Sequence, residues 1–488
     1  MNGNPISDDE RLPRAAPATV RSTLTTARGV LSYRATADYL PVVETVVTDG
    51  RAAGRRVSAR VFTVSYLAEP ASSARTASRP VIFAFNGGPG SSTMWLHLGL
   101  LGPRRVDAGD ADRPVAPPYA LHDNPESALT VADLVFLDPV GTGYSHVTDG
   151  TDDAEFDGQT RDAECIAEAI RTWISRHDRW DAPKYLAGES YGTVRAVAVA
   201  DRLDTVFGMP INGLLLLSPV LSGLAAPGPL GADLAHALRL PTYAAAAHWH
   251  HRHPGRGLDE VRAEAETFAL EEYLPALTLG ARLEPQRRHA TAQRIATLCG
   301  LATDFVLQAN LRVGPGRFYA ELLRDRGHVV SRMDARFTGT DADQRGEMYS
   351  RDPGLFAVLG PYASAFAHYV GHELGFRDDR PFQPFTVQQR PWKPRTHSEG
   401  GDSVLPELGR LLRTYPHLRV YVAMGVYDGS TPYFASDWEL AQLALPADAR
   451  RNIGRHEYPA GHMMYLHEPS RVEQSAHIRE FVAAGGGA

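Results

Sequence analysis

Residues 183–203 read "PKYLAGESYGTVRAVAVADRL", and this stretch decides the fold. An apolar run typical of a strand ends in "AGESYG", and a run with helical character follows it. Gly188 and Gly192 frame Ser190 in a G-x-S-x-G pattern and permit a sharp turn between the strand and the helix. Such a turn exposes the serine hydroxyl and points the helix N-terminus toward it. We therefore predict that Ser190 is a nucleophile; the alternative is a serine that only caps a helix.

Other apolar runs on both sides of this unit are also typical of buried strands. They are "PVIFAFNGG" (80–88), "ADLVFLDPVGTG" (132–143) and "INGLLLLSP" (211–219). Helical patterns such as that of residues 158–178 lie between them. Strands that alternate with helices predict an α/β fold with a doubly wound, mostly parallel sheet.

The composition and the strand and helix patterns of the sequence divide the chain into three parts. Residues 1–25 are polar and contain prolines, so we expect a disordered arm. Residues 26–221 and 416–488 carry the strand and helix alternation of the α/β core. Residues 222–415 are rich in Ala, Leu and Arg and show few strand signals, which predicts a large, mostly helical lid insertion. Ligands bind at the carboxyl ends of parallel strands, where such a lid would control access.

The composition limits the kinds of binding partner and the cellular compartment that we expect for this protein. The formal net charge is −7, from 50 basic and 57 acidic residues, which argues against nucleic acid or an anionic membrane as a partner. We find neither a run apolar enough to cross a membrane nor a secretory signal at the N-terminus. Cys165 and Cys299 are too few for a disulfide framework, and we expect inert core thiols. A cytoplasmic protein of unknown oligomeric state is expected.

A nucleophilic serine needs a general base, and the base needs a carboxylate that orients it. In α/β-hydrolases these residues follow the serine in the order acid, then histidine. Asp428 follows the apolar run "VYVAMGVY", and His462 follows the strand-like "HEYPA". Asp402 and Asp437 are rival acids, but neither follows a buried strand. His462 is one of nineteen histidines, so an ordinary loop histidine is the alternative; its position after the last strand favours the base.

The glycine-rich stretch "FNGGPGSSTMWLHLGLLGP" (85–103) is the expected source of an oxyanion donor. Acyl transfer needs two N–H groups where negative charge develops. We predict that the N–H groups of Gly88 and Tyr191, the residue after the nucleophile, supply them. A phosphate-binding P-loop is the competing interpretation, but the Gly-Lys-Ser/Thr sequence of that loop is missing.

Together these motifs resemble the serine carboxypeptidases of the α/β-hydrolase fold. The matching segments are "NGGPGSS" (86–92), "DPVGTGYS" (138–145), "GESYG" (188–192), "GVYD" (425–428) and "GH" (461–462). Within residues 222–415, "LPTYAAAAHWH" and "SRMDARFTGTDAD" look like the bacterial branch of the family. The resemblance implies a protease that removes C-terminal residues through an acyl-enzyme on Ser190. It also implies that Asn86, Gly87 and Glu189 hold the C-terminal carboxylate of the substrate.

The sequence departs from the family pattern close to Glu189. A neutral Glu189 can donate a hydrogen bond to a carboxylate, whereas an ionised one repels it. Relatives have a second glutamate that shares a proton with this one, and Leu100 stands at that position. His97 lies one helical turn earlier and either faces Glu189 or packs in the core. Arg195 either reaches a substrate carboxylate or forms a structural salt bridge.

We therefore predict a serine carboxypeptidase-like hydrolase that acts on peptides. The first alternative is an acyltransferase or a dedicated biosynthetic peptidase with the same site. The non-enzyme hypothesis is a peptide-binding scaffold without catalytic activity. "HWHHRH" (248–253) is the strongest candidate for a metal site, but it lacks an acidic partner with suitable spacing. We expect neither a metal nor a cofactor.

Overall fold

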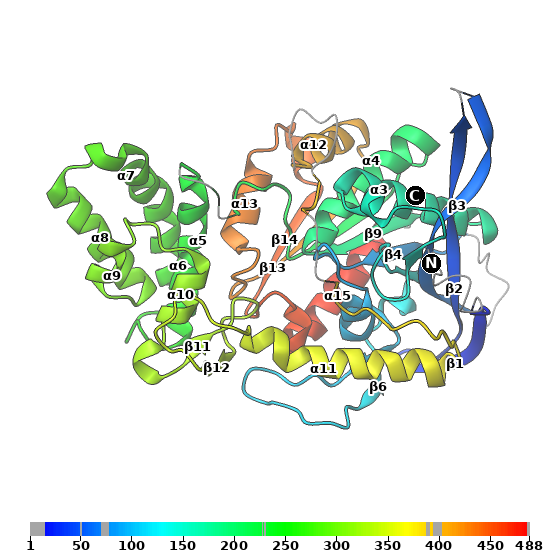
Figure 1. The fold of residues 1–488 in the computed structure, drawn as a ribbon, viewed down its shortest axis with the longest axis horizontal. Helices are drawn as coiled ribbons and strands as arrows, with labels where there is room; N and C mark the ends of the chain where they lie inside the picture. The colour runs from blue at the N-terminus through cyan, green and yellow to red at the C-terminus, as the bar shows by residue number, and fades with distance from the viewer. Residues whose placement is uncertain are drawn as a thin grey trace, which may run out of the picture.

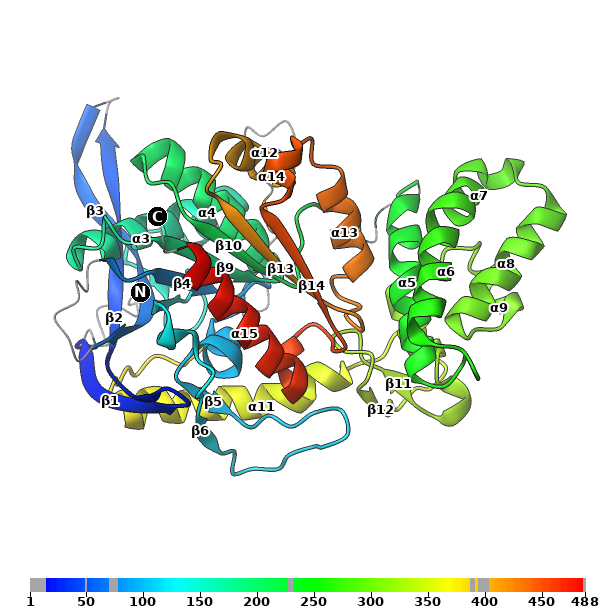
Figure 2. The ribbon, with the colours of Figure 1, turned by 180° about the vertical axis from the view of Figure 1, so that it is seen from behind.

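A mixed ten-stranded sheet forms the centre of the computed structural model (Figures 1 and 2). The strands pair in the order β1-β2-β3-β7-β4-β9-β10-β13-β14, and β8 pairs with β3 outside this path. The structure describes residues 15–48, 51–69, 78–226, 228, 231–386, 391–393 and 403–485. The strands of this sheet are β1 (Ala18–Thr26), β2 (Gly29–Thr48), β3 (Arg51–Ala68), β4 (Val81–Phe85), β7 (Asp133–Leu137), β8 (His146–Val147), β9 (Lys184–Glu189), β10 (Gly213–Leu217), β13 (Arg419–Gly425) and β14 (Ile453–Tyr458).

The strands from β7 to β14 in this order run parallel, whereas β1, β2 and β3 extend the sheet as an antiparallel edge. Every residue of β4, β7, β9 and β10 is buried, because helices cover both faces of the parallel part. The predicted doubly wound α/β fold is confirmed.

The two faces of the sheet pack into two separate hydrophobic cores. On β4, Phe83 and Phe85 join the core formed with α3 (Gln159–Arg176), α4 (Tyr191–Phe207) and α12 (Leu405–Thr414). Ile82 and Ala84 point the other way, into the core formed with α2 (Met94–Leu96) and α15 (Glu468–Gly485). This alternation follows from the two-residue period of a strand.

Most of the described residues between β10 and β13 are helical. Figure 1 shows α5 to α10 as a lobe at one end of the molecule and α11 along the side of the core. The elements are α5 (Asp233–Trp249), α6 (Leu258–Phe268), α7 (Leu274–Leu279), α8 (Pro285–Cys299), α9 (Thr303–Gln308), α10 (Pro315–Glu321), β11 (Val329–Val330), β12 (Thr338–Gly339) and α11 (Pro353–His368). We call residues 222–404 the insertion.

The smaller elements lie in the connections of the core. They are β5 (Arg104–Val106) and β6 (Leu121–Asp123), which pair with each other, and α13 (Tyr433–Ala441) and α14 (Ala447–Arg450), which lie between β13 and β14.

Two predicted boundaries need correction. Residues 18–25 of the expected disordered arm belong to β1, which pairs along its whole length with β2; residues 1–14 lie outside the described residues. The helical insertion ends before α12, not at residue 415. Arg410 of α12 pairs with Asp201 and Asp204 of α4, so this helix belongs to the layer that covers the sheet.

The two cysteines are free and buried, as predicted for core thiols. Burial raises the pKa of the Cys165 thiol to about 12, which keeps it protonated and unreactive. Within the described parts of the chain, the structure contains no helix with the length and apolar character that a membrane crossing requires.

Candidate active site

Ser190 lies in the sharp turn between β9 and α4. Its backbone has φ of 60° and ψ of −130°, a conformation that non-glycine residues rarely adopt, and α4 begins at the next residue. The flanking glycines are required by packing: a Cβ atom at Gly188 would lie 2.0 Å from the carbonyl oxygen of Gly192. A Cβ atom at Gly192 would lie 2.8 Å from the carbonyl oxygen of Phe85. The turn therefore presents Ser190 at the carboxyl edge of the sheet.

Asp428 and His462 meet at the same edge, after β13 and β14. The Nδ1 atom of His462 lies 2.7 Å from Oδ2 of Asp428. The carboxylate also accepts hydrogen bonds from Ser430 N at 2.8 Å, Thr431 N at 2.9 Å and Thr431 Oγ1 at 2.5 Å. Asp428 is completely buried. The three hydrogen bonds from Ser430 and Thr431 therefore fix the orientation of the carboxylate, and the carboxylate in turn orients the imidazole of His462.

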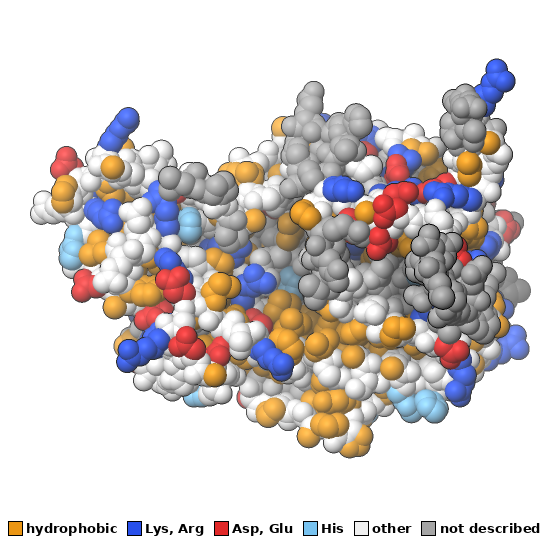
Figure 3. Space-filling model, in the orientation of Figure 1, with side chains coloured by type: hydrophobic (Ala, Val, Ile, Leu, Met, Phe, Trp, Pro, Cys, Tyr) orange, Lys and Arg blue, Asp and Glu red, His pale blue; other side chains and the backbone are white. Residues whose placement is uncertain are grey.

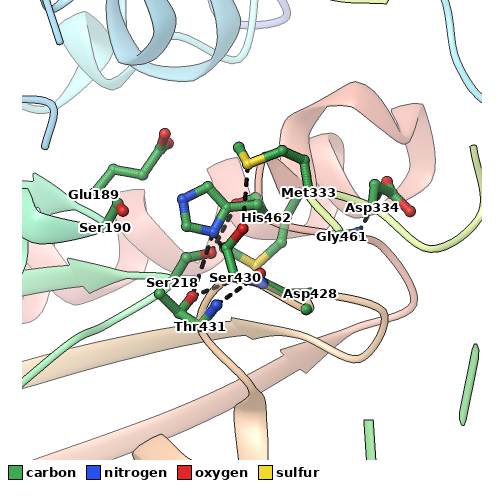
Figure 4. A network of polar contacts seen from close by, with 12 residues as sticks. Glu189, Ser190, Ser218, Met333, Asp334, Asp428, Ser430, Thr431, Gly461 and His462 are labelled. Atoms are coloured by element: carbon green, nitrogen blue, oxygen red, sulfur yellow. Dashed lines mark hydrogen bonds and ion pairs between the residues drawn. The ribbon is translucent and has the colours of Figure 1, made fainter. Parts of the chain in front are cut away.

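Ser190 lies on the side of the imidazole away from Asp428 (Figure 4). Burial lowers the pKa of His462, but the charge of Asp428 and its hydrogen bond outweigh this effect and raise the pKa above its ordinary value. Among the described residues the structure shows no direct hydrogen bond between Ser190 and His462. Such bonds in serine hydrolases often tighten only when substrate binds.

The segments that carry the two predicted oxyanion donors pack against each other. Gly87 packs so closely on the start of α4 that a Cβ atom there would be 2.5 Å from Tyr191 N. Gly88 follows with φ of +103°, which favours glycine. Within the described residues, neither Gly88 N nor Tyr191 N donates to a backbone carbonyl. Both donors are thus available for an oxygen that develops negative charge.

Asn86 and Glu189 form a buried pair beside the nucleophile. Asn86 Nδ2 donates to Glu189 Oε1 at 2.9 Å, while Asn86 Oδ1 accepts from Leu96 N at 3.2 Å. Burial raises the pKa of Glu189 to about 7, although nearby His462 and Asn86 oppose part of this rise. Glu189 is therefore neutral at mildly acidic pH, although Leu100 stands where the resemblance implies a second glutamate.

His97 does not compensate for the missing acid by facing Glu189. Its Nε2 lies 2.6 Å from the hydroxyl of Tyr66, and its ring stacks on Phe136. Burial lowers the pKa of His97 to about 3, so the ring is neutral. Residues 97–101 form a π-helical turn instead of the α-helical turn expected from the sequence. Because the number of residues per turn differs, His97 and Leu100 do not point in the directions that an α-helix would give them. Leu100 is buried in the core on this side of the sheet.

Two tyrosines occupy the space near Glu189 instead. A Cβ atom at Gly99 would lie 2.4 Å from the ring of Tyr465 and 2.6 Å from the hydroxyl of Tyr362. The Tyr465 hydroxyl is near enough to Glu189 to lower its pKa slightly, and Glu189 in turn raises the pKa of both tyrosines beyond the effect of burial. The sequence signal for this arrangement was Gly99 itself, since a glycine within a helical apolar run marks a close approach.

Arg195 forms a structural salt bridge, one of the two alternatives considered above. Its Nε lies 2.8 Å from Oδ2 of Asp162, and its Nη1 donates to the carbonyl oxygen of Asn86. Its guanidinium also lies over the ring of Tyr191. Because Arg195 is buried, it holds the residues of the site in place from behind.

The histidine-rich segment 248–253 does not form a cluster. His248, His250 and His253 each place Nε2 near a different backbone carbonyl oxygen, of Arg256, Ala335 and Thr297. Across the described part of the chain, no three His, Cys, Asp or Glu side chains are grouped as metal ligands would be.

Sequence reasoning missed the part played by residues 331–337 of the insertion. This segment, which we call the clamp, lies between the loops that carry Asp428 and His462. Met333 O accepts from His462 N at 2.7 Å, and Arg332 O accepts from Gly429 N at 2.9 Å. Asp334 Oδ2 accepts from Gly461 N at 3.1 Å (Figure 4). The clamp therefore fixes the backbone of both loops.

A buried ion pair holds the clamp itself. Arg336 Nη2 lies 2.6 Å from Oδ2 of Asp334 and 3.1 Å from Oδ1 of Asp110 in the core. Both Asp334 and Arg336 are buried. The signal that could have found the clamp was "DAR" at 334–336, since a charged pair beside apolar residues suggests a buried interaction.

A pocket of about 180 Å³ opens beside Ser190 between the core and the insertion. From the core it is lined by residues including Asn86, Gly88, Glu189, Ser190, His462 and Met463, and from the insertion by Arg332, Met333, Leu355 and Phe385. The insertion therefore covers the carboxyl ends of the strands at this point. The volume is below the range of about 300–1,000 Å³ typical of pockets for drug-sized ligands, so the pocket accommodates only a small group.

A serine at a strand-to-helix turn, with an aspartate and a histidine from the next strands, defines the class of the α/β-hydrolases. Residues 66–203 match the family model described as serine carboxypeptidase. This match includes the NGGPGSS and GESYG segments. The placement of the chain in a bacterial branch stays a prediction.

Two plant proteins are similar to part of this chain. Serine carboxypeptidase-like 16 of Arabidopsis thaliana is 28% identical over 151 residues, and serine carboxypeptidase-like 26 of the same plant is 32% identical over 129 residues. These alignments cover 29% and 26% of this chain, and only 33% and 26% of the relatives.

The likeness of the fold extends further along the chain. The crystal structure of Kex1Δp, a prohormone-processing carboxypeptidase from Saccharomyces cerevisiae, matches with a TM-score of 0.50 at 13% identity. This match covers 92% of this chain and 91% of the yeast protein. It supports the fold of both the core and much of the insertion.

The contact between Gly461 and Asp334 gives a first prediction. A Cβ atom at Gly461 would lie 2.2 Å from Cβ of Asp334, so Gly461→Ala must displace the loop of His462. We expect kcat, or the rate of labelling of Ser190 by a fluorophosphonate, to fall by at least about 100-fold, because a displacement of about 1 Å in a catalytic group has this effect.

Gly454→Ala is the matched control, since Gly454 lies on β14 and a Cβ atom there meets no atom closer than 3.6 Å. Circular dichroism of both variants shows whether the fold persists. A folded Gly461→Ala variant with the activity of the wild type would contradict the role of the clamp.

Proposed function

We propose that this protein is a serine carboxypeptidase, a hydrolase that removes C-terminal residues from peptides. The observation that carries the proposal is the position of the buried Asn86–Glu189 pair beside Ser190, in the same pocket as His462. A serine hydrolase without selectivity for chain ends has no need for a buried, protonated carboxyl group at this place.

The geometry supports a mechanism with an acyl-enzyme. His462 accepts the proton of Ser190 as its hydroxyl attacks the scissile carbonyl, and Asp428 stabilises the imidazolium that forms. Gly88 N and Tyr191 N donate to the oxyanion of the tetrahedral intermediate. His462 then gives the proton to the amine of the leaving residue. A water molecule, activated by His462, hydrolyses the ester on Ser190 and releases the shortened peptide.

Asn86 and Glu189 select the chain end in this proposal. Neutral Glu189 donates one hydrogen bond to the terminal carboxylate, and Asn86, held by Leu96 N and Glu189, directs its amide group to the same place. The backbone of Gly87 lies alongside. A C-terminal amide has no negative charge and would bind less well.

We also infer that the protein works in a reducing compartment such as the cytoplasm. The support for this is that both cysteines are free thiols and neither takes part in a structural cross-link.

The nucleophile is tested by replacement of Ser190. We expect a fluorophosphonate to label the wild type but not Ser190→Ala, and kcat for peptides to fall by about 10⁴- to 10⁶-fold, because the acyl-enzyme cannot form. Ser430→Ala is the matched control, since this hydroxyl lines the same pocket, and we expect it to be labelled.

Mass spectrometry of the products, with an added amine, separates hydrolysis from acyl transfer. Shortened peptides with a free carboxyl group support the proposal, whereas peptides joined to the amine support an acyltransferase. Equal labelling of wild type and Ser190→Ala would contradict the assignment of the nucleophile.

The role of Glu189 predicts a pH dependence. Because its pKa is raised to about 7, Glu189 is neutral below this pH and becomes an anion above it. We expect kcat/KM for peptides with a free C-terminus to fall as the pH rises through about 7, since the anion repels the substrate carboxylate. Glu189→Gln stays neutral, so its activity should persist to higher pH.

The matched substrate is the same peptide with a C-terminal amide, for which the fall should be absent. Steady-state rates between about pH 5 and about pH 8 measure both profiles. Equal cleavage of the acid and the amide over this range would show that Glu189 does not bind the terminal carboxylate.

A further inference from the structure

The pocket beside Ser190 contains a charged group that the mechanism above does not use. Arg332, from the clamp, lines the pocket together with Glu189, Ser190 and His462, and its side chain is exposed. Among the described residues that line this pocket, Arg332 alone carries a permanent positive charge, because a guanidinium does not lose its proton in proteins.

The backbone of Arg332 is fixed on both sides. Its N–H group donates to Oδ2 of Asp352 at 2.8 Å and lies 3.1 Å from the hydroxyl of Tyr349. Its carbonyl oxygen accepts from Gly429 N, and the next residue, Met333, binds the backbone of His462. The guanidinium is therefore attached to a rigid base that has a defined position relative to the catalytic histidine.

The guanidinium itself has no ion-pair partner among the described residues. The nearby carboxylate of Asp352 is engaged elsewhere: Oδ1 accepts from Ser331 Oγ at 2.5 Å and from the N–H groups of Gly354 and Leu355 at 3.1 Å. Arg336, four residues after Arg332 in the chain, is by contrast buried and paired with two aspartates. The clamp thus holds one arginine for structure and presents the other to the pocket.

The electrostatics of the pocket favour an anionic ligand. Glu189 is neutral at mildly acidic pH, so the described lining residues then include no anion that would compete for Arg332. A positive charge within a small cleft raises the local concentration of anions. A guanidinium binds carboxylates with two parallel hydrogen bonds, which gives the interaction a direction as well as strength.

We propose that Arg332 binds a carboxylate on the leaving residue of the substrate, and that the enzyme prefers peptides that end in Asp or Glu. This inference rests on the proposed function, because that function places the leaving residue in this pocket. Asn86 and Glu189 hold the terminal carboxylate near the buried wall, and the acidic side chain extends to exposed Arg332. A leaving residue with two carboxylates satisfies both parts of the pocket.

The test compares peptides that differ only in a C-terminal Glu or Gln. For the wild type we expect kcat/KM to favour Glu by about 10- to 100-fold, the range for a hydrogen-bonded charge pair. Arg332→Ala should abolish this preference, mainly through a higher KM for the Glu peptide, and Arg332→Lys should keep part of it. Arg326→Ala is the matched control, because this exposed arginine of the insertion does not line the pocket.

Two other results would overturn the assignment. If Arg332→Ala leaves the preference for Glu over Gln unchanged but removes the preference for a free acid over an amide, Arg332 binds the terminal carboxylate instead. If Arg332→Ala changes the rates for Glu and Gln peptides equally and only moves the acidic limb of the pH profile, it acts on His462 through its charge and binds no substrate group.

A second measurement does not depend on peptidase activity. N-acetylglutamate should protect Ser190 of the wild type from a fluorophosphonate better than N-acetylglutamine does, and Arg332→Ala should remove the difference. Protection without any peptide cleavage would contradict the proposed function but support the carboxylate site. Equal protection by the two compounds in the wild type would overturn the inference about Arg332.

Discussion

The hydrogen bonds of the clamp to the loops of Asp428 and His462 are the constraint on which the site depends. Two loops after neighbouring parallel strands have no intrinsic reason to keep a carboxylate and an imidazole 2.7 Å apart. The clamp binds Gly429, Gly461 and His462 through their backbone N–H groups, and the Asp334–Arg336 pair holds the clamp. The insertion is therefore part of the catalytic framework as well as a cover for the pocket.

On the other side of Ser190, glycines allow backbones to touch. Gly87 lies against the start of α4, and Gly188 and Gly192 leave no room for a side chain between β9 and α4. This packing brings the segments that carry Gly88 and Tyr191 together, and Glu189 is buried beside them. The same burial raises the pKa of Glu189 to about 7. Geometry and protonation at the site thus follow from one tightly packed junction.

Away from this junction, exposed side chains such as Phe356 contribute to the apolar surface over α11 (Figure 3).

The sequence predicted those features that depend on local order along the chain. Ser190 and Asp428 follow buried strands, His462 follows the edge strand β14, and parallel strands deliver such residues to one edge of the sheet. The environment of Glu189 depended on contacts between distant segments and was not predictable in this way. The π-helical turn redirected His97 to Tyr66, and Tyr465 and Tyr362 approached through the space at Gly99. The clamp was missed because nothing local shows that residues 331–337 reach His462.

The most direct test of this account is a crystal structure of the enzyme after reaction with a peptidyl phosphonate. The account predicts a covalent bond to Oγ of Ser190, with one phosphonyl oxygen within hydrogen-bond distance of both Gly88 N and Tyr191 N. It also predicts unchanged contacts from the clamp to Gly461 and His462. A phosphonyl oxygen that points away from these N–H groups, or a clamp that leaves the His462 loop in the complex, would contradict it.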